Sequence, residues 1–195
     1  MFTKQIGNVI VHFEPLIIVV VAILIVYFVL ALLLMYRGKK ITKSFQAGNY
    51  EDVLKEGIKL LKTYQRYAKR YKRKPRNIIA WIEYLNFALA VSNFSVKNYE
   101  QFLYHISALT QNQDIKEFWL SLYCLRQDDL DGFQSHYENI KVTEETLINR
   151  TYLESIKLYT QAEYDQAKTK MSEIYSDLKH PVLMKIADRI LKFSN

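Results

Sequence analysis

The segment that comes closest to a metal-binding pattern is residues 127–138, QDDLDGFQSHYE. Four of its residues match positions of a calcium-binding EF-hand loop, in which carboxylates bind the ion and a glycine makes the sharp turn: Asp129, Asp131, Gly132 and Glu138. Gln127 stands where the first carboxylate ligand belongs. Acidic residues also favour the N-terminus of any helix, because the helix dipole is positive there. The pattern therefore predicts the start of a helix and no calcium site.

No other group of residues has the spacing of a catalytic or cofactor-binding site. The four histidines share no metal-ligand spacing: His12, His105, His136 and His180. The chain has neither a Gly-rich phosphate loop nor a nucleophile elbow. The lone cysteine, Cys124, lies among apolar residues, which predicts a core position and excludes an internal disulfide framework. We therefore expect no catalytic residue, no metal and no cofactor, and we expect that the protein is not an enzyme.

Positive charge is concentrated in one part of the chain. Residues 37–76 contain 14 Lys and Arg against 3 Asp and Glu, a net charge of +11, whereas residues 77–195 contain 12 against 16, a net charge of −4. The densest stretch is 62–76, in which three tyrosines fall on one helical face. Its candidate contacts for anionic lipid or another acidic partner are Arg66, Lys69, Arg70, Lys72, Arg73, Lys74, Arg76, Tyr67 and Tyr71. A nucleic-acid patch and a merely solvated helix end are the alternatives.

A long apolar segment precedes the basic part of the chain. Residues 16–35 contain no charged side chain, and 20 residues of helix are about as long as a bilayer core is thick. A cleaved signal peptide would have a shorter apolar stretch, preceded by positive charge and followed by small residues. We therefore predict a transmembrane helix over residues 16–36, preceded by a short N-terminal tail over residues 1–15.

The charges beside this segment predict its orientation. Only Lys4 precedes it, whereas four basic residues follow it closely: Arg37, Lys39, Lys40 and Lys43. Because Lys and Arg are retained on the cytoplasmic side, we expect a single-pass protein of the cell membrane with its N-terminus outside and residues 37–195 in the cytoplasm. If the chain reverses at residues 48–49, the next helix returns toward the bilayer and brings the basic stretch to the lipid headgroups.

The composition and periodicity of the remaining chain predict an all-α domain. Glycine (5) and proline (3) are scarce, and apolar residues recur at helical spacing between short polar breaks. Four helix pairs follow, with breaks near residues 48–49, 93–96, 127–129 and 162. A last helix over residues 182–193 is expected to cap an otherwise exposed end.

Two of the breaks share a sequence pattern, GNYEDV at residues 48–53 and AEYDQA at residues 162–167. Each has a small residue at the turn, an aromatic residue two positions later and a small or medium apolar residue three positions beyond. This resembles the junction between the two helices of a tetratricopeptide repeat, whose period is about 34 residues. From Leu130 to Tyr164 the chain advances by one such period, whereas from Tyr50 to Tyr99 it advances by nearly one and a half. The alternative is an unrelated bundle of helical hairpins.

The resemblance implies a function in binding. Tetratricopeptide-like solenoids hold a peptide or helix in a concave face, so residues 37–195 are expected to form a protein–protein interaction scaffold or an assembly factor at the membrane. The expected partners are an unidentified protein and the membrane, with nucleic acid a weaker alternative. The rival functions are a structural subunit of a membrane complex and an RNA- or ribosome-associated factor that uses residues 62–76.

Overall fold

The structure is a computed structural model of the chain and describes residues 3–6, 9–12, 14–70 and 75–193. The chain divides into two compact units, Met1–Lys40 and Ile41–Asn195. In the first unit, β1 (Thr3–Ile6) and β2 (Val9–His12) form an antiparallel hairpin. This short hairpin lies in the predicted tail, for which no structure was expected. The sequence signal for it is a Gly-Asn pair between two short runs of β-prone residues.

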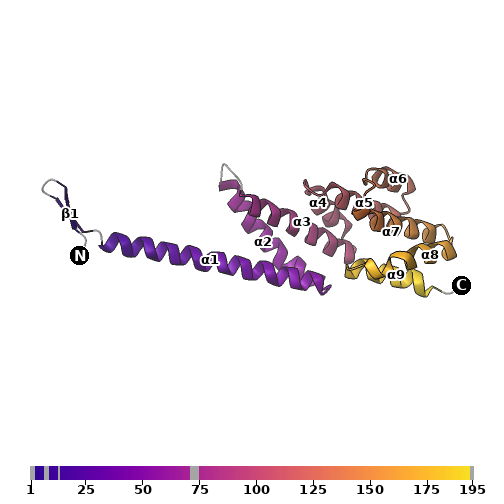
Figure 1. The fold of residues 1–195 in the computed structure, drawn as a ribbon, viewed down its shortest axis with the longest axis horizontal. Helices are drawn as coiled ribbons and strands as arrows, with labels where there is room; N and C mark the ends of the chain where they lie inside the picture. The colour runs from indigo at the N-terminus through magenta and orange to yellow at the C-terminus, as the bar shows by residue number, and fades with distance from the viewer. Residues whose placement is uncertain (1–2, 7–8, 13, 71–74, 194–195) are drawn as a thin grey trace. The chain divides into compact units, whose positions relative to one another are not determined.

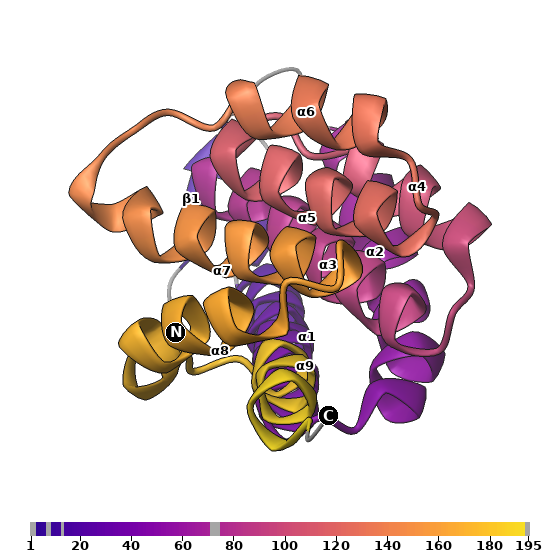
Figure 2. The same ribbon diagram turned by 90° about the vertical axis from the view of Figure 1, so that its right-hand side faces the viewer.

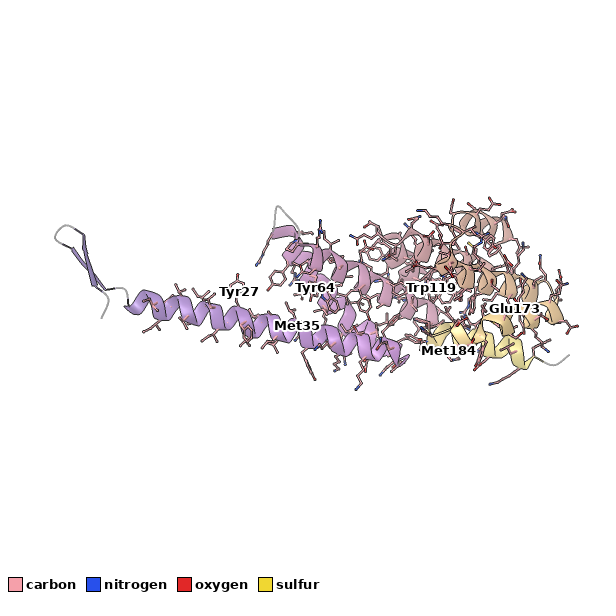
Figure 3. The ribbon with its side chains drawn as sticks, viewed as in Figure 1. Tyr27, Met35, Tyr64, Trp119, Glu173 and Met184 are labelled. Carbon is pink, nitrogen blue, oxygen red and sulfur yellow. The ribbon has the colours of Figure 1, made fainter. Side chains whose placement is uncertain are left out.

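The helix α1 (Glu14–Gln46) contains the predicted apolar segment. From Ile17 to Met35 its large apolar side chains are exposed, except the half-buried Leu34, and they project from the helix on opposite sides (Figure 3). The stretch Ile17–Gln46 is long and apolar enough to cross a membrane, although a signal sequence passes the same test. Among the described residues one other helix, α3, also passes this test, but about half of it is buried, as in the core helix of a soluble domain.

The second unit contains the end of α1 and a series of shorter helices, drawn from magenta to yellow in Figure 1. Within the described residues these helices are α2 (Tyr50–Arg70), α3 (Arg76–Ser95), α4 (Tyr99–Ser107), α5 (Gln113–Arg126), α6 (Leu130–Glu138), α7 (Glu144–Thr160), α8 (Tyr164–Ile174) with the 3₁₀ turn η1 (Tyr175–Asp177), and α9 (Pro181–Lys192). The described part of this domain is helical throughout, which confirms the all-α prediction. The four predicted helix pairs correspond to the end of α1 with α2, α3 with α4, α5 with α6, and α7 with α8.

Each of these helices packs against a neighbour in the sequence, most closely α2 with α3, α3 with α4, α5 with α6 and α7 with α8. α3 packs against α2 and α4, α5 against α6 and α7, and α8 against α7 and α9 (Figure 2). Aromatic contacts join the first helix of each pair to the next: Phe94 of α3 lies 5.3 Å from Trp119 of α5, and Phe118 of α5 lies 5.9 Å from Tyr152 of α7, between ring centroids. The core therefore runs without interruption through α3, α5 and α7.

The four helix-pair junctions have the same backbone geometry. At each one a single residue has a positive φ: Gly48 (73°), Lys97 (62°), Asp128 (56°) and Ala162 (64°). The next backbone N–H donates to the carbonyl five residues earlier: Asn49 to Ser44 (2.9 Å), Asn98 to Asn93 (2.8 Å), Asp129 to Cys124 (3.0 Å) and Glu163 to Leu158 (2.9 Å). The turns predicted at residues 48 and 162 are confirmed, and two further turns of this kind occur without a small residue.

The predicted break at residues 93–96 is displaced. α3 continues to Ser95, and three of its polar side chains donate back to the carbonyl four residues earlier: Ser92 (2.7 Å), Asn93 (2.8 Å) and Ser95 (2.8 Å). Because these side chains are satisfied inside the helix, a cluster of Ser and Asn does not end it here. The helix ends shortly before the turn at Lys97.

Two of the histidines, His105 and His136, make the same kind of side-chain contact in successive helix pairs. Nδ1 of His105 lies 3.0 Å from Oδ1 of Asn86, and Nδ1 of His136 lies 2.7 Å from Oε2 of Glu117. In both cases a histidine of the second helix contacts a residue of the first helix 19 positions earlier. Glu117 follows Asn86 by 31 residues, and His136 follows His105 by the same interval. The pairs α3–α4 and α5–α6 thus share one equivalent side-chain contact, which is compatible with a helical repeat.

Acidic acceptors near the start of the same two pairs, the buried Glu83 and the half-buried Asp114, repeat with the same offset. The backbone N–H of Thr110 donates to Glu83 (3.0 Å), and that of Lys141 donates to Asp114 (3.0 Å), each across 27 residues. Each carboxylate thus fixes the loop that follows the second helix of its pair. Each contact gives a loop N–H a charged acceptor, which accounts for an acidic residue at this position.

The last helix does more than cover the end of the domain. α9 packs on α8, and the Tyr152 hydroxyl donates to the Leu183 carbonyl (3.1 Å). The residue before α9, His180, also contacts Phe45 at the end of α1 (5.1 Å) and Trp119 of α5 (5.8 Å), between ring centroids. The prediction of a terminal cap is therefore incomplete, because the N-terminus of α9 also joins the last pair to the first.

Candidate interaction site

The segment that imitates an EF-hand is the N-terminus of α6. Oδ1 of Asp129 accepts the backbone N–H of Gly132 (2.9 Å), so this carboxylate caps the helix. Burial and the neighbouring Asp129 raise the pKa of the Cys124 thiol to about 11, so the thiol stays protonated and unreactive at neutral pH. Among the described residues no group of three or more His, Cys, Asp or Glu side chains could hold a metal ion.

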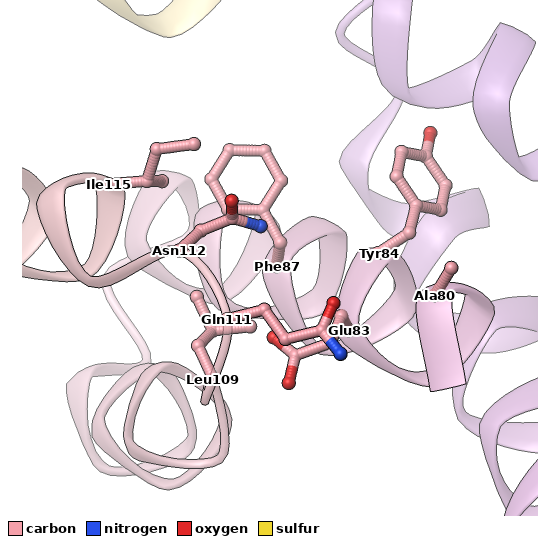
Figure 4. A pocket seen from close by; sticks show the side chains of 8 residues that line it. All are labelled: Ala80, Glu83, Tyr84, Phe87, Leu109, Gln111, Asn112 and Ile115. Carbon is pink, nitrogen blue, oxygen red and sulfur yellow. The ribbon is translucent and has the colours of Figure 1, made fainter. Parts of the chain in front are cut away.

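Two adjoining pockets lie on the exposed side of α3, one on each side of Tyr84. The first has a volume of about 290 Å³ and lies between α3, α5 and the loop that joins α4 to α5 (Figure 4). The second has a volume of about 310 Å³ and lies between α3 and the end of α1. We call them the Tyr84 pockets. Their described lining residues are Thr42, Asn77, Ala80, Trp81, Glu83, Tyr84, Phe87, Leu109, Gln111, Asn112 and Ile115.

The spacing of aromatic residues along α3 explains why this face is apolar. Leu85 and Leu89 are fully buried in the core, while Trp81 and Tyr84 fall on the side that lines the pockets. Trp81 is held in place by Tyr64 of α2, whose ring stacks on it at 6.0 Å with an interplanar angle of 6°. This stacking places the half-buried Trp81 ring at the edge of the second pocket.

A cluster of aromatic rings forms the floor below the first pocket. Phe45 of α1 contacts Tyr84 (6.4 Å) and Phe87 (5.9 Å), and Phe87 contacts Trp119 (6.4 Å), between ring centroids. His180 closes the cluster from the side of α9. Edge-to-face contacts are a favourable geometry for aromatic rings. Through these contacts the floor joins α1, α3, α5 and the start of α9.

Few charges face the Tyr84 pockets. Among their described lining residues only Glu83 has a carboxyl group, which accepts hydrogen bonds from the backbone N–H and the hydroxyl of Thr110. Burial raises the pKa of the Tyr84 phenol, while a hydrogen bond with Thr42 opposes this shift. Tyr84 is therefore a neutral phenol at physiological pH. The amides of Gln111 and Asn112 complete a small polar rim.

The predicted basic contacts are only partly within the described residues. Arg66, Lys69 and Arg70 are exposed at the end of α2, Arg76 is exposed at the start of α3, and Tyr67 is half-buried. Tyr71, Lys72, Arg73 and Lys74 lie outside the described residues. The ion pairs found in the described part of the chain involve none of the four basic residues. They remain available to an acidic surface.

The Tyr84 pockets are absent from the expectations drawn from the sequence. The signal for them is that α3 is apolar on nearly every side, with aromatic residues at positions 81, 84 and 87 opposite the predicted core positions. Such a helix is completely buried in a domain core or exposes an apolar surface, and only the packing of its neighbours decides between these outcomes.

Comparisons of the chain with protein-family models, with curated proteins and with solved structures found no match.

Proposed function

We propose that this chain is a membrane-anchored interaction scaffold or assembly factor, whose tetratricopeptide-like domain faces the cytoplasm and binds a protein partner through the Tyr84 pockets. The observation that carries the proposal is an apolar, preformed surface on the first helices of successive helical hairpins. Stacked helical hairpins expose such surfaces along their length, and binding proteins use them to hold a helix or an extended segment.

Three features of the domain support the tetratricopeptide-like interpretation. The hairpins share one turn geometry, and two of them share polar contacts that repeat at a constant offset. The last two turns, at Asp128 and Ala162, are separated by one tetratricopeptide period. The long first interval reflects the lengths of α2 (21 residues) and α3 (20 residues), which exceed those of the later helices. The proposed repeat is therefore regular in its turns and irregular in its helix lengths.

The chemistry of the pockets defines the kind of partner. Each pocket accommodates a large apolar side chain, and the exposed Ile115, at 37% exposure, extends the apolar surface along α5. Glu83 places a negative charge at the first pocket and disfavours an acidic ligand there. The proposed partner therefore presents apolar side chains on an amphipathic helix or a short extended segment, with neutral or basic residues between them.

The membrane anchor in this proposal is α1. Its apolar side chains have no protein core to cover them within the described residues of the first unit, and a bilayer would remove them from water. The orientation follows from the basic residues at 37, 39, 40 and 43, which favour a cytoplasmic domain.

The test compares partners that co-purify with the full chain from the membranes in which it is naturally found. Ile115→Glu places a charge in the first pocket, and Ala80→Glu places one between the two pockets. Gln134→Glu introduces the same charge on the exposed surface of α6 and is the matched control. We expect a stoichiometric partner that the control retains and both pocket variants lose. If all three variants retain the same partners, the pockets are not the binding site.

A further inference from the structure

Five basic residues lie on one exposed face of α2. Their spacing of four, three, four and three residues places them within one stripe of a helix with 3.6 residues per turn. All five are exposed: Lys55, Lys59, Lys62, Arg66 and Lys69. We call this stripe the α2 ridge, and at 1.5 Å per residue it is about 21 Å long. It begins at Lys55, before the basic stretch of residues 62–76.

The ridge is directly opposite the buried face of α2. The residues that pack against α3 and its neighbours are Val53, Gly57, Leu60, Leu61, Tyr64 and Ala68. Gly57 allows a close approach, since a Cβ atom there would lie 3.1 Å from Cδ2 of Leu89. The orientation of the ridge is therefore fixed by the core, and its side chains point away from the domain.

The charge of the ridge is compensated only weakly. Lys59 forms an ion pair with Glu56 (3.1 Å), and no other ridge residue takes part in an ion pair found among the described residues. The acidic residues at the turn before α6 lie in another helix pair, with α3 and α4 between. Three acidic residues of α2 itself, Glu51, Asp52 and Glu56, offset the charge at the start of the ridge, whereas the part from Lys62 to Lys69 contains no acidic residue. This uneven distribution orients the domain on a charged surface.

We infer that the α2 ridge lies along an anionic lipid surface. The inference rests on the proposed membrane anchor, because only 13 residues lie between Tyr36, at the end of the apolar segment, and Tyr50, the first residue of α2. Even a fully extended chain of that length spans at most about 50 Å. The ridge is thus confined near the bilayer, where anionic headgroups attract each nearby Lys or Arg.

The side chains beside the ridge favour lipid over nucleic acid. Nucleic-acid surfaces of this kind combine basic residues with exposed aromatic rings on which bases stack. Tyr64 is only 8% exposed and stacks on Trp81, so the predicted tyrosine face does not accompany the ridge there. Ile58, at 40% exposure, lies at the edge of the ridge and is suited to the boundary between headgroups and acyl chains.

The experiment uses the full chain reconstituted into vesicles, with Cys124→Ser to remove the native thiol. A fluorescent probe is attached at Ile58→Cys beside the ridge, or at Gln134→Cys on α6 as the control position. The vesicles carry a headgroup-linked quencher and consist of phosphatidylcholine alone or of phosphatidylcholine with phosphatidylglycerol. Resistance of the chain to alkaline extraction reports the anchor separately from the contact of the ridge.

We expect quenching of the probe at residue 58 only in the anionic vesicles, with recovery as salt is raised, because exposed charges are screened. Lys62→Gln should shift the ratio of quenched to unquenched protein about fivefold, the factor that corresponds to about 1 kcal/mol per basic residue. Lys185→Gln makes the same change of charge on α9 and should have no effect. The probe at residue 134 should be unquenched in both kinds of vesicle.

Several results would overturn the inference. Equal quenching in neutral vesicles, or an unchanged ratio in Lys62→Gln, would show that the ridge does not recognise anionic lipid. An RNA oligonucleotide that binds the full chain in neutral vesicles, and loses binding in Lys62→Gln without any quenching in anionic vesicles, would assign the ridge to nucleic acid. Alkaline extraction of the chain would overturn the anchor itself, whereas an extraction-resistant chain without quenching would overturn only the ridge.

Discussion

Substitution of Ala167 tests the packing of the last helix pair. Ala167 is fully buried where α8 meets α7, and its carbonyl accepts the Ser155 hydroxyl (2.7 Å). Met171, one turn further along α8, is also fully buried. Ala167→Glu adds a larger side chain and a carboxyl group at a site with no room for either.

The magnitude follows from two costs. Overpacking of a well-packed site costs about 1–3 kcal/mol, and a buried polar group without a partner costs about 1–3 kcal/mol more. The carboxyl is expected to take up a proton, because an unpaired buried charge costs more than neutralisation. The sum is about 4 kcal/mol, and for a domain of this size each kcal/mol lowers the melting temperature by about 2–4 °C. We therefore expect a loss of about 8–16 °C.

The assay is thermal unfolding of the full chain in mild detergent, followed by tryptophan fluorescence. Both tryptophans of the chain, Trp81 and Trp119, lie in the helical domain, so the signal reports that domain and not α1. Ala80→Glu is the matched control on an exposed helical position, with an expected change of less than about 0.5 kcal/mol. A melting temperature of Ala167→Glu within about 2 °C of the unsubstituted chain would refute the close packing of α7 and α8.

Three further predictions concern pH, a buried acceptor and topology. Burial lowers the pKa of His180 to about 4, so between about pH 6.5 and pH 4 the unfolded chain binds a proton that the folded chain does not. The free energy of unfolding is therefore highest above about pH 6.5 and falls by up to about 3 kcal/mol toward pH 4. Urea titrations should find this loss reduced in His180→Asn. Glu83→Ala should lower the free energy of unfolding by about 2 kcal/mol in the same titrations, because it leaves the loop after α4 without its acceptor. In intact cells with Cys124→Ser, an impermeant maleimide should label Thr3→Cys and not Ser194→Cys, and the reverse pattern would contradict a cytoplasmic domain.

The sequence predicted the helices and turns where a single local signal was decisive. Gly48 marks its turn because glycine accepts a positive φ at low cost, whereas Ala162, although small, bears the cost of its Cβ atom in this conformation. Lys97 and Asp128 take the same conformation without that signal, since the backbone hydrogen bonds and helix packing outweigh a cost of about 1–2 kcal/mol. Asn93 and Ser95 suggested a loop because their bonds to carbonyls inside the helix cannot be foreseen from composition.

The candidate sites depended on tertiary packing that periodicity does not reveal. The sequence grouped three tyrosines with the basic stretch, yet Tyr64 packs on Trp81 in the core. The ridge from Lys55 to Lys69 was missed because charge density, rather than helical spacing, was used to delimit the basic stretch. The Tyr84 pockets depend on where α5 and the end of α1 pack around α3, which no local pattern specifies.

Site-specific photo-crosslinking in living cells tests the proposed scaffold most directly. A photoreactive amino acid is placed at Ala80 or Ile115 in the Tyr84 pockets, or at Gln134 on α6 as the control position, and crosslinked products are recovered from the membrane fraction. We predict that both pocket positions crosslink to the same protein and that the control position does not. The absence of any crosslinked protein at the two pocket positions, or equal crosslinking at Gln134, would contradict the proposal that these pockets bind a protein partner at the membrane.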